Sequence, residues 1–134
     1  MTSITAKYAG LLRCEAQHGP SGNTLITDAP TDNAGKGEAF SPTDLVATAL
    51  ITCMLTVMGI QAQKMRKEFQ AQGEVHKHMA SNPRHIGKLE VTLRAESGAF
   101  TKEQKQLLDQ VARACPVAMS LLENTEQDVH IVWS

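Results

Sequence analysis

The sequence predicts a single α+β domain spanning residues 1–134, with the element order ββ–α–ββ–αα–β. Segments in which apolar and polar residues alternate, as in strands, lie on both sides of one long apolar segment. Two further helix signals follow only after the second pair of strands. The composition, 42% hydrophobic and 20% charged over 134 residues, is typical of a globular chain that buries one core.

The first two strands are expected to form a hairpin. Residues 4–17 alternate loosely and predict one strand, and residues 24–28 predict the second. Between them, the HGPSGN segment at 18–23 carries the Gly and Pro residues that favour a turn. Residues 29–40 follow as a loop rich in Gly, Asp and Asn, and its length suggests a functional role.

A long helix is predicted from Ser41 to about Arg66. Ser41 is a good N-cap, Pro42 suits the first helical position, and Asp44 completes a capping signal. Residues 45–60 are apolar almost all round, which indicates burial on every side. Because a chain of this length can hardly surround such a helix alone, we expect a dimer in which both subunits cover it.

The second half of the chain alternates strands and helices. Residues 69–80 and 87–96 alternate well and predict two strands. Thr101 caps the next helix, residues 115–122 form a short one, and residues 128–134 close the chain as a strand. The apolar face expected for the longer helix consists of Leu107, Leu108, Val111 and Ala112.

Charge and patterning exclude several partners. The net charge of −1 gives no basic footprint for nucleic acid, and the KMRK cluster at 64–67 lies where a helix end favours cations. The N-terminus lacks a signal-peptide pattern, and Thr and Gln residues interrupt the apolar helix, so no membrane partner is expected. We therefore expect a cytoplasmic protein whose three cysteines are core thiols, metal ligands or redox groups.

The cysteines differ in their settings. Cys53 lies in the middle of the apolar helix, where burial raises a thiol pKa unless a cation or donor is brought in. Cys115 precedes Pro116 at the start of the short helix, where unpaired backbone N–H groups favour a thiolate. From the residues alone, two buried core thiols are the simpler interpretation. Cys14 is interpreted as a strand thiol without a special role.

No cofactor is expected from the motifs. His76 and His78 share one face of a strand and could bind a metal, but no Cys-x-x-Cys or further ligand cluster supports them. The GKG segment at 35–37 lacks the strand–loop–helix context of a phosphate-binding loop.

Two motifs resemble the osmotically inducible protein C / organic hydroperoxide resistance family (OsmC/Ohr). One is the helix start SPTDL, which contains Pro42 and is followed eleven residues later by Cys53. The other is ARACPVAMSL at 112–121, which is similar to the family's A-x-x-CPV segment. The resemblance implies an OsmC-like fold, with antiparallel sheets around a long buried central helix. It also implies an intertwined homodimer with two active sites at the subunit interface.

The resemblance implies a thiol-dependent peroxidase that reduces organic hydroperoxides and, more weakly, hydrogen peroxide in oxidative-stress defence. Cys53 would be the peroxidatic thiolate and would become a sulfenic acid. Cys115 would resolve it as a Cys53–Cys115 disulfide, which an external dithiol, such as a lipoyl protein, would reduce by exchange. Neither a metal nor a flavin is needed.

The activating residues depart from the family pattern. The family activates its cysteine with an arginine that is held by a glutamate near the helix start, often in NPE-x-L. Here Thr43 stands in the glutamate's place and the acid, Asp44, comes one position later. Asp44 and Glu38 are the candidate acids, and Arg13 is the preferred arginine. The alternative sources of positive charge are Lys36 and His18.

A non-enzymatic function is the alternative. An OsmC-like dimer could bind a small apolar ligand in its interface pocket, with Cys53 and Cys115 as remnants. A basic side chain within hydrogen-bond reach of Cys53 would favour the enzyme. The apolar residues around Cys53 suit an organic substrate, although they can equally be core. They are Val46, Ala49, Leu50 and Val57.

Overall fold

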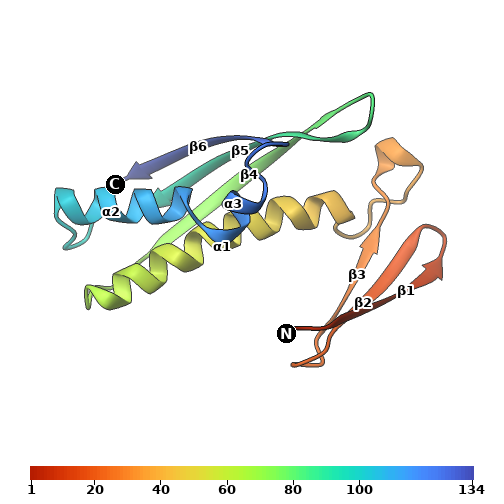
Figure 1. The fold of residues 1–134 in the computed structure, drawn as a ribbon, viewed down its shortest axis with the longest axis horizontal. Helices are drawn as coiled ribbons and strands as arrows, with labels where there is room; N and C mark the ends of the chain where they lie inside the picture. The colour runs from red at the N-terminus through yellow and green to blue at the C-terminus, as the bar shows by residue number, and fades with distance from the viewer. The chain divides into compact units, whose positions relative to one another are not determined.

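The computed structural model describes all residues, 1–134, and confirms the α+β class (Figure 1). The elements are β1 (Ile4–Gly10), β2 (Arg13–His18), β3 (Thr24–Asp28), a 3-10 turn (Thr31–Asn33), α1 (Pro42–Lys64), β4 (Ala71–Ala80), β5 (His85–Ala95), α2 (Lys102–Arg113), α3 (Pro116–Ser120) and β6 (Glu126–Trp133). They form two compact units, Met1–Val46 and Ala47–Ser134, which are described separately. One functional domain over residues 1–134 stays a prediction.

The first unit is an antiparallel sheet of order β1-β2-β3. The prediction of one strand over residues 4–17 is wrong, because the chain reverses at Leu11 and Leu12 and forms two paired strands. Both leucines lie in the left-handed region, with φ of 54° and 64°. Leucine carries no turn signal, so the alternation pattern hides the reversal.

The first unit has no hydrophobic core of its own. Every buried apolar residue of the chain lies at or after Ala47, whereas large apolar side chains of β1 and β3 remain exposed. The buried residues of this unit, Asp28 and Ser41, are both polar. Because a three-stranded sheet needs a packed apolar face for stability, this unit requires a covering surface. The exposed apolar side chains on its strands are Ile4, Tyr8, Leu25 and Ile26.

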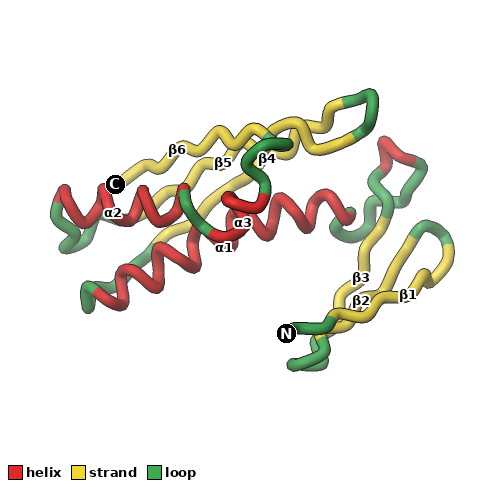
Figure 2. The backbone as a smooth tube through the Cα atoms, in the orientation of Figure 1, coloured by secondary structure: helices red, strands yellow, loops and turns green.

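The second unit is a sheet of order β4-β5-β6 with helices on one face (Figures 1 and 2). β4 pairs with β5 antiparallel, but β5 pairs with β6 parallel, so the expectation of purely antiparallel sheets is wrong in this detail. The segment that joins β5 to β6 contains α2 and α3. This long helical connection returns the chain in the same direction, as parallel pairing requires.

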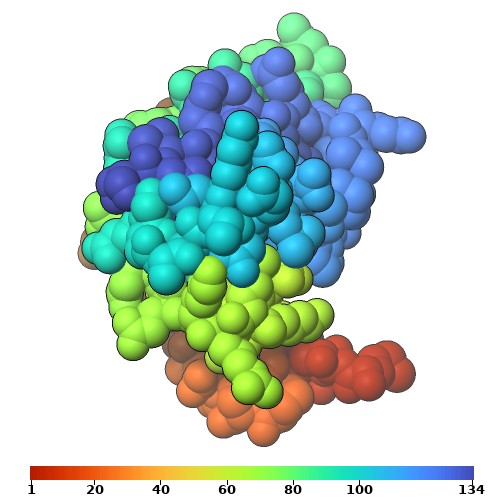
Figure 3. Space-filling model, turned by 90° about the vertical axis from the view of Figure 1, so that its left-hand side faces the viewer, coloured from red at the N-terminus to blue at the C-terminus, as the bar shows by residue number.

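Helix α2 begins as the sequence predicts. The Thr101 hydroxyl accepts a hydrogen bond from the backbone N–H of Gln104 at 3.1 Å, and the Gln104 side chain accepts one from the Thr101 N–H. Figure 3 shows the end of α1 beside the start of α2. There the Lys67 ammonium donates to the carbonyl oxygen of Ala99 at 2.6 Å and so ties the two segments together.

Helix α1 buries one face only within the chain, and burial on every side by a second subunit stays a prediction. Thr52, Thr56 and Ile60 are exposed, and Cys53 is half-buried. Its buried face shares one hydrophobic core with β5 and with Leu108, Ala112 and Ala118 of the two later helices. By length and composition, α1 could also cross a membrane, but its buried face belongs to the hydrophobic core of the second unit. The buried residues of α1 are Ala47, Leu50, Ile51, Met54, Met58 and Ala62.

Candidate functional site

Cys115 caps the N-terminus of α3, as the sequence predicts. Its sulfur accepts a hydrogen bond from the backbone N–H of Ala118 at 3.4 Å, and Pro116 occupies the first helical position. Only 1% of the Cys115 surface is exposed. Cys53, on α1, is half-buried and packs against the same core. Two helices far apart in the sequence therefore bring these two thiols to one place.

The thiols of Cys53 and Cys115 interact directly. Burial raises the pKa of the Cys115 thiol above its ordinary value, the N–H of Ala118 acts against this rise, and a side-chain hydrogen bond with Cys53 raises the pKa further. The N–H groups at the helix start do lower the pKa of Cys115, as expected, but burial outweighs them and the net direction is upward. At neutral pH, Cys115 is a thiol that can donate its proton toward the Cys53 sulfur.

The two free thiols can perform redox chemistry on each other. A half-buried sulfur can meet a small oxidant, while the buried one beside it is protected from direct attack. Such a pair suits formation of a sulfenic acid followed by a disulfide. No group of three or more His, Cys, Asp or Glu side chains lies close enough to hold a metal ion.

Arg13 is held by Asp28. The Arg13 Nε donates to Asp28 Oδ1 at 2.7 Å and Nη2 donates to Oδ2 at 2.8 Å, which makes a two-pronged ion pair. The hydrogen bond and the positive charge of Arg13 hold the pKa of Asp28 below its ordinary value, and Asp28 in turn raises the pKa of Arg13. The guanidinium of Arg13 is therefore fixed, and its carboxylate partner, Asp28, was not among the acids predicted from the sequence.

The register of β2 against β3 could have identified Asp28 as the partner of Arg13 from the sequence. Arg13 begins β2 and Asp28 ends β3, and they are direct partners across the antiparallel pair. A register counted outward from the turn at 18–23 would have placed the two side by side. The sequence reading sought the acid near the helix start instead.

The two predicted acids have other contacts. The Asp44 carboxylate accepts a hydrogen bond from the Ser41 N–H at 2.9 Å, and the Ser41 hydroxyl accepts one from the Asp44 N–H at 3.1 Å, so Asp44 completes the helix cap. Glu38 donates its backbone N–H to Asp28 Oδ2 at 3.1 Å. The negative charge of the Glu38 side chain raises the pKa of Arg13 further. Their roles in the site remain predictions.

The remaining basic candidates are placed as follows. The His18 ring nitrogen lies 2.6 Å from the Ser21 hydroxyl within the hairpin turn. Lys36 lies near enough to Asp28 for its positive charge to lower the pKa of that carboxyl. Lys36 therefore belongs to the surroundings of the Arg13–Asp28 pair, whereas His18 has a local structural contact.

Cys14, and the two histidines considered as metal ligands, also have local contacts. Cys14 is half-buried on β2, where it lies opposite Tyr8 and Thr27. His76 lies 3.3 Å from Glu74, and His78 lies 3.1 Å from Glu90. These two histidines therefore have carboxylate partners on the exposed face of their sheet.

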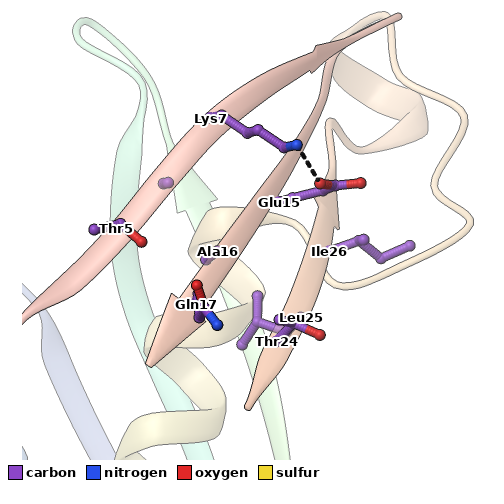
Figure 4. A pocket seen from close by; sticks show the side chains of 9 residues that line it. Thr5, Lys7, Glu15, Ala16, Gln17, Thr24, Leu25 and Ile26 are labelled. Atoms are coloured by element: carbon purple, nitrogen blue, oxygen red, sulfur yellow. Dashed lines mark ion pairs between the residues drawn. The ribbon is translucent and has the colours of Figure 1, made fainter. Parts of the chain in front are cut away.

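A hollow of about 790 Å³ lies on the sheet of the first unit (Figure 4). Lys7 and Glu15 form an exposed ion pair of 3.3 Å at its side. The lining contains neither a thiol nor a guanidinium group, so this hollow is not the place of the sulfur chemistry. Its lining residues are Thr5, Ala6, Lys7, Glu15, Ala16, Gln17, Thr24, Leu25 and Ile26.

Comparisons with known proteins agree with the motifs. A family model described as OsmC-like protein matches residues 35–130. A Psychrobacter arcticus protein, named for an osmotic-stress-induced detoxification response, is 42% identical, with a TM-score of 0.90 and coverage of 98% of this chain and 96% of that chain. No curated protein matches.

Two more distant solved structures share the fold. The organic hydroperoxide resistance protein OsmC of Legionella pneumophila is 20% identical, with a TM-score of 0.71 and coverage of 98% of this chain and 96% of that chain. The organic hydroperoxide resistance protein OhrB of Bacillus subtilis is 17% identical, with a TM-score of 0.67 and coverage of 98% and 97%. The family model and the 42% identical relative show that the chain belongs to the OsmC-like family.

Proposed function

We propose that this protein is a cysteine-based peroxidase that reduces organic hydroperoxides, and hydrogen peroxide more weakly, in cytoplasmic oxidative-stress defence. The observation that carries the proposal is the pair of interacting thiols, Cys53 half-buried and Cys115 buried. The 42% identical relative is named for a detoxification response, and two structural neighbours are named for organic hydroperoxide resistance.

The first step oxidises Cys53. Its thiolate attacks the terminal peroxide oxygen, the O–O bond breaks, and the alkoxide leaves as an alcohol after it takes a proton. Cys53 is then a sulfenic acid, oxidised by two electrons. Cys115, a neutral thiol at this stage, supports the Cys53 thiolate as a hydrogen-bond donor and does not compete for the peroxide.

The second step forms a disulfide. The Cys115 sulfur attacks the sulfenic sulfur of Cys53, and the hydroxyl leaves as water with the Cys115 proton. An external dithiol, for which a lipoyl protein is the candidate, then attacks the disulfide, becomes a disulfide itself and restores both thiols. No metal or cofactor takes part in this cycle.

We assign to Arg13 the positive charge that favours the Cys53 thiolate in the assembled protein. The support is that Arg13 is fixed by a two-pronged ion pair, because a preorganised cation stabilises a thiolate and a developing alkoxide better than a mobile one. Asp44 secures the start of the helix that carries Cys53, and Glu38 secures the carboxylate that holds Arg13.

We also propose that the working form is a homodimer. The first unit has an uncovered sheet with exposed apolar side chains, and α1 has an exposed apolar residue, Ile60, on the surface away from its core face. A second copy of the chain can cover exposed apolar groups of this kind, which a single chain leaves in contact with water.

Peroxide consumption by the purified protein tests the proposal. Cumene hydroperoxide and hydrogen peroxide are supplied with dihydrolipoamide, and the wild type is compared with Cys53→Ser and Cys115→Ser. Cys14→Ser is the matched control, because it removes a thiol that is given no role. We expect faster turnover of cumene hydroperoxide, loss of turnover in Cys53→Ser and normal turnover in Cys14→Ser.

The same assay can also contradict the peroxidase proposal. If neither peroxide is consumed and mass spectrometry finds Cys53 unmodified, the peroxidase proposal is wrong. A dimer that binds a small apolar ligand without chemistry would then be the better account of the fold.

A further inference from the structure

Gln127 occupies a position on β6 where the pattern of the strand calls for an apolar side chain. Alternate residues of β6 share the face that is turned toward the helices, and the other three on that face, Val129, Ile131 and Trp133, pack against the core. Gln127 pairs in register with Leu89 of β5, which is fully buried. A polar side chain at such a position is costly unless it is hydrogen-bonded, so its partner indicates what it does.

The partner of Gln127 is the main chain of α3. Gln127 Nε2 donates to the carbonyl oxygen of Ala118 at 2.8 Å, and the backbone N–H of Ala118 donates to the Cys115 sulfur at 3.4 Å. Ala118 is fully buried. One residue of α3 therefore accepts the side chain of β6 with its carbonyl group and holds the Cys115 sulfur with its N–H. All three residues belong to the second unit.

Helix α3 depends on such anchoring. It has five residues and is joined by loops on both sides (Figure 2). An isolated helix of this length is not stable in water, because the first turn fixes many backbone angles for few hydrogen bonds. A second anchor follows the helix, where the Thr125 hydroxyl donates to the carbonyl oxygen of Ile86 at 3.0 Å. Gln127 therefore anchors the helix itself, and Thr125 anchors the segment after it.

The thiol pair is sensitive to the position of this helix. Cys53 lies on α1, and Cys115 reaches it from the start of α3 through a side-chain hydrogen bond. A disulfide requires the two Cβ atoms to lie about 4 Å apart, and a misplacement of about 1 Å can slow a chemical step about a hundredfold. A shift of α3 by that amount would separate the two sulfurs and leave Cys53, on the core helix, in place.

We infer that Gln127 is a positioning residue for Cys115, a role that rests on the proposed function: it holds α3 so that the Cys115 sulfur stays within reach of the Cys53 sulfenic acid. In the step that it supports, the Cys115 sulfur attacks the Cys53 sulfur, the S–O bond breaks, and the hydroxyl leaves as water with the Cys115 proton. Fast resolution also protects Cys53. A second peroxide oxidises a persisting sulfenic acid to a sulfinic acid and is itself reduced to an alcohol.

Gln127→Met removes the donor with little change in size. Gln127 lines an open hollow of about 280 Å³, so a flexible methionine of similar length fits there without overpacking. Asp109→Ala is the matched control, because the Asp109 carboxylate accepts a hydrogen bond from Trp133 Nε1 at 3.1 Å and so also joins a helix to β6. Gln127 and Trp133 lie near opposite ends of β6, about 20 Å apart along the strand.

Two experiments are made on the full-length protein in a Cys14→Ser background. Rapid quenching after addition of cumene hydroperoxide, with mass spectrometry, follows the oxidation of Cys53, the disulfide and the sulfinic acid. Equilibration with reduced and oxidised glutathione measures the stability of the Cys53–Cys115 disulfide without any peroxide. We expect Gln127→Met to keep the wild-type rate of Cys53 oxidation, to slow disulfide formation and to raise the sulfinic fraction. Its disulfide should be about threefold to tenfold less favoured against glutathione, and Asp109→Ala should match the wild type in both experiments.

The outcomes distinguish this inference from the proposed function. If the wild type consumes no peroxide, the proposed function fails, and the glutathione equilibrium still tests the anchor. Wild-type disulfide formation and a wild-type equilibrium in Gln127→Met would overturn the inference, even if its Tm falls. An equal shift in Asp109→Ala would also overturn it, because the effect would then follow the general stability of the fold. If Gln127→Met does not fold, Gln127→Glu replaces the donor by an acceptor at the same length and is judged by the same criteria.

Discussion

Replacing Cys115 by serine and by alanine separates its chemical role from its structural one. Both changes remove the sulfur, so both should abolish resolution of the Cys53 sulfenic acid. They differ in the cap of α3, where the Cys115 sulfur now accepts the Ala118 N–H at 3.4 Å. A serine hydroxyl can accept that hydrogen bond, and an alanine methyl cannot.

The structure sets the size of the difference. Loss of an N-cap acceptor costs about 0.5–2 kcal/mol, and the volume of the missing sulfur at this fully packed position adds roughly 1 kcal/mol. Cys115→Ala should therefore lose about 2 kcal/mol of unfolding free energy. Cys115→Ser, which keeps the cap and fills most of the space, should lose about 1 kcal/mol.

Two assays check this prediction. Urea unfolding measures the free energies, and a single turnover with one equivalent of cumene hydroperoxide in the presence of dimedone measures the trapped sulfenic acid by mass spectrometry. Both variants should accumulate the Cys53 adduct, and the wild type should form the disulfide instead. Equal stability of the two variants would refute the capping argument, and an equal adduct yield in the wild type would refute the resolving role of Cys115.

Three further predictions concern pH and packing. Folding lowers the pKa of Asp28, so its ion pair with Arg13 stabilises the chain above about pH 4 and loses this effect as pH falls through the folded pKa. The Tm difference between the wild type and Asp28→Asn should therefore vanish in acid. Burial raises the pKa of Cys115 in the folded chain, so above about pH 8.5 the unfolded chain loses the thiol proton first and is favoured. The unfolding free energy of the wild type, measured with urea, should therefore fall relative to that of Cys115→Ser as pH rises. A Cβ at Gly73 would lie 2.6 Å from Leu93 Cδ2 and 2.8 Å from Ile51 Cδ1, so thermal unfolding of Gly73→Ala should show a loss of about 1–3 kcal/mol.

The elements that the sequence predicted well are those specified by neighbouring residues. The starts of α1, α2 and α3 each depend on a side chain that bonds to a backbone group three residues away, at Ser41, Thr101 and Cys115. Such short-range chemistry is visible in the sequence because both partners lie in one segment. The motif around Cys53 and Cys115 likewise identified the pair that the fold brings together.

The features that escaped prediction depend on distant residues. The reversal at Leu11 and Leu12 is imposed by strand pairing on residues with no turn preference. The partner of Arg13 follows from a cross-strand register, which a search confined to the helix start could not find. The sequence indicated the N–H groups that lower the pKa of Cys115 because helix capping is local, but not the larger opposite effect of burial, which comes from the whole core.

Burial also decides how the disulfide between Cys53 and Cys115 would be reduced. In the proposed cycle, the 1% exposure of Cys115 would block attack at its sulfur, so the reductant would join Cys53 and expel Cys115. A buried sulfur with a raised pKa is a poor leaving group, which would slow this exchange. The N–H of Ala118 points at that same sulfur and stabilises negative charge as it develops there. In the proposed cycle, the N-cap of α3 would therefore stabilise the negative charge on the departing Cys115 sulfur, which burial alone would disfavour.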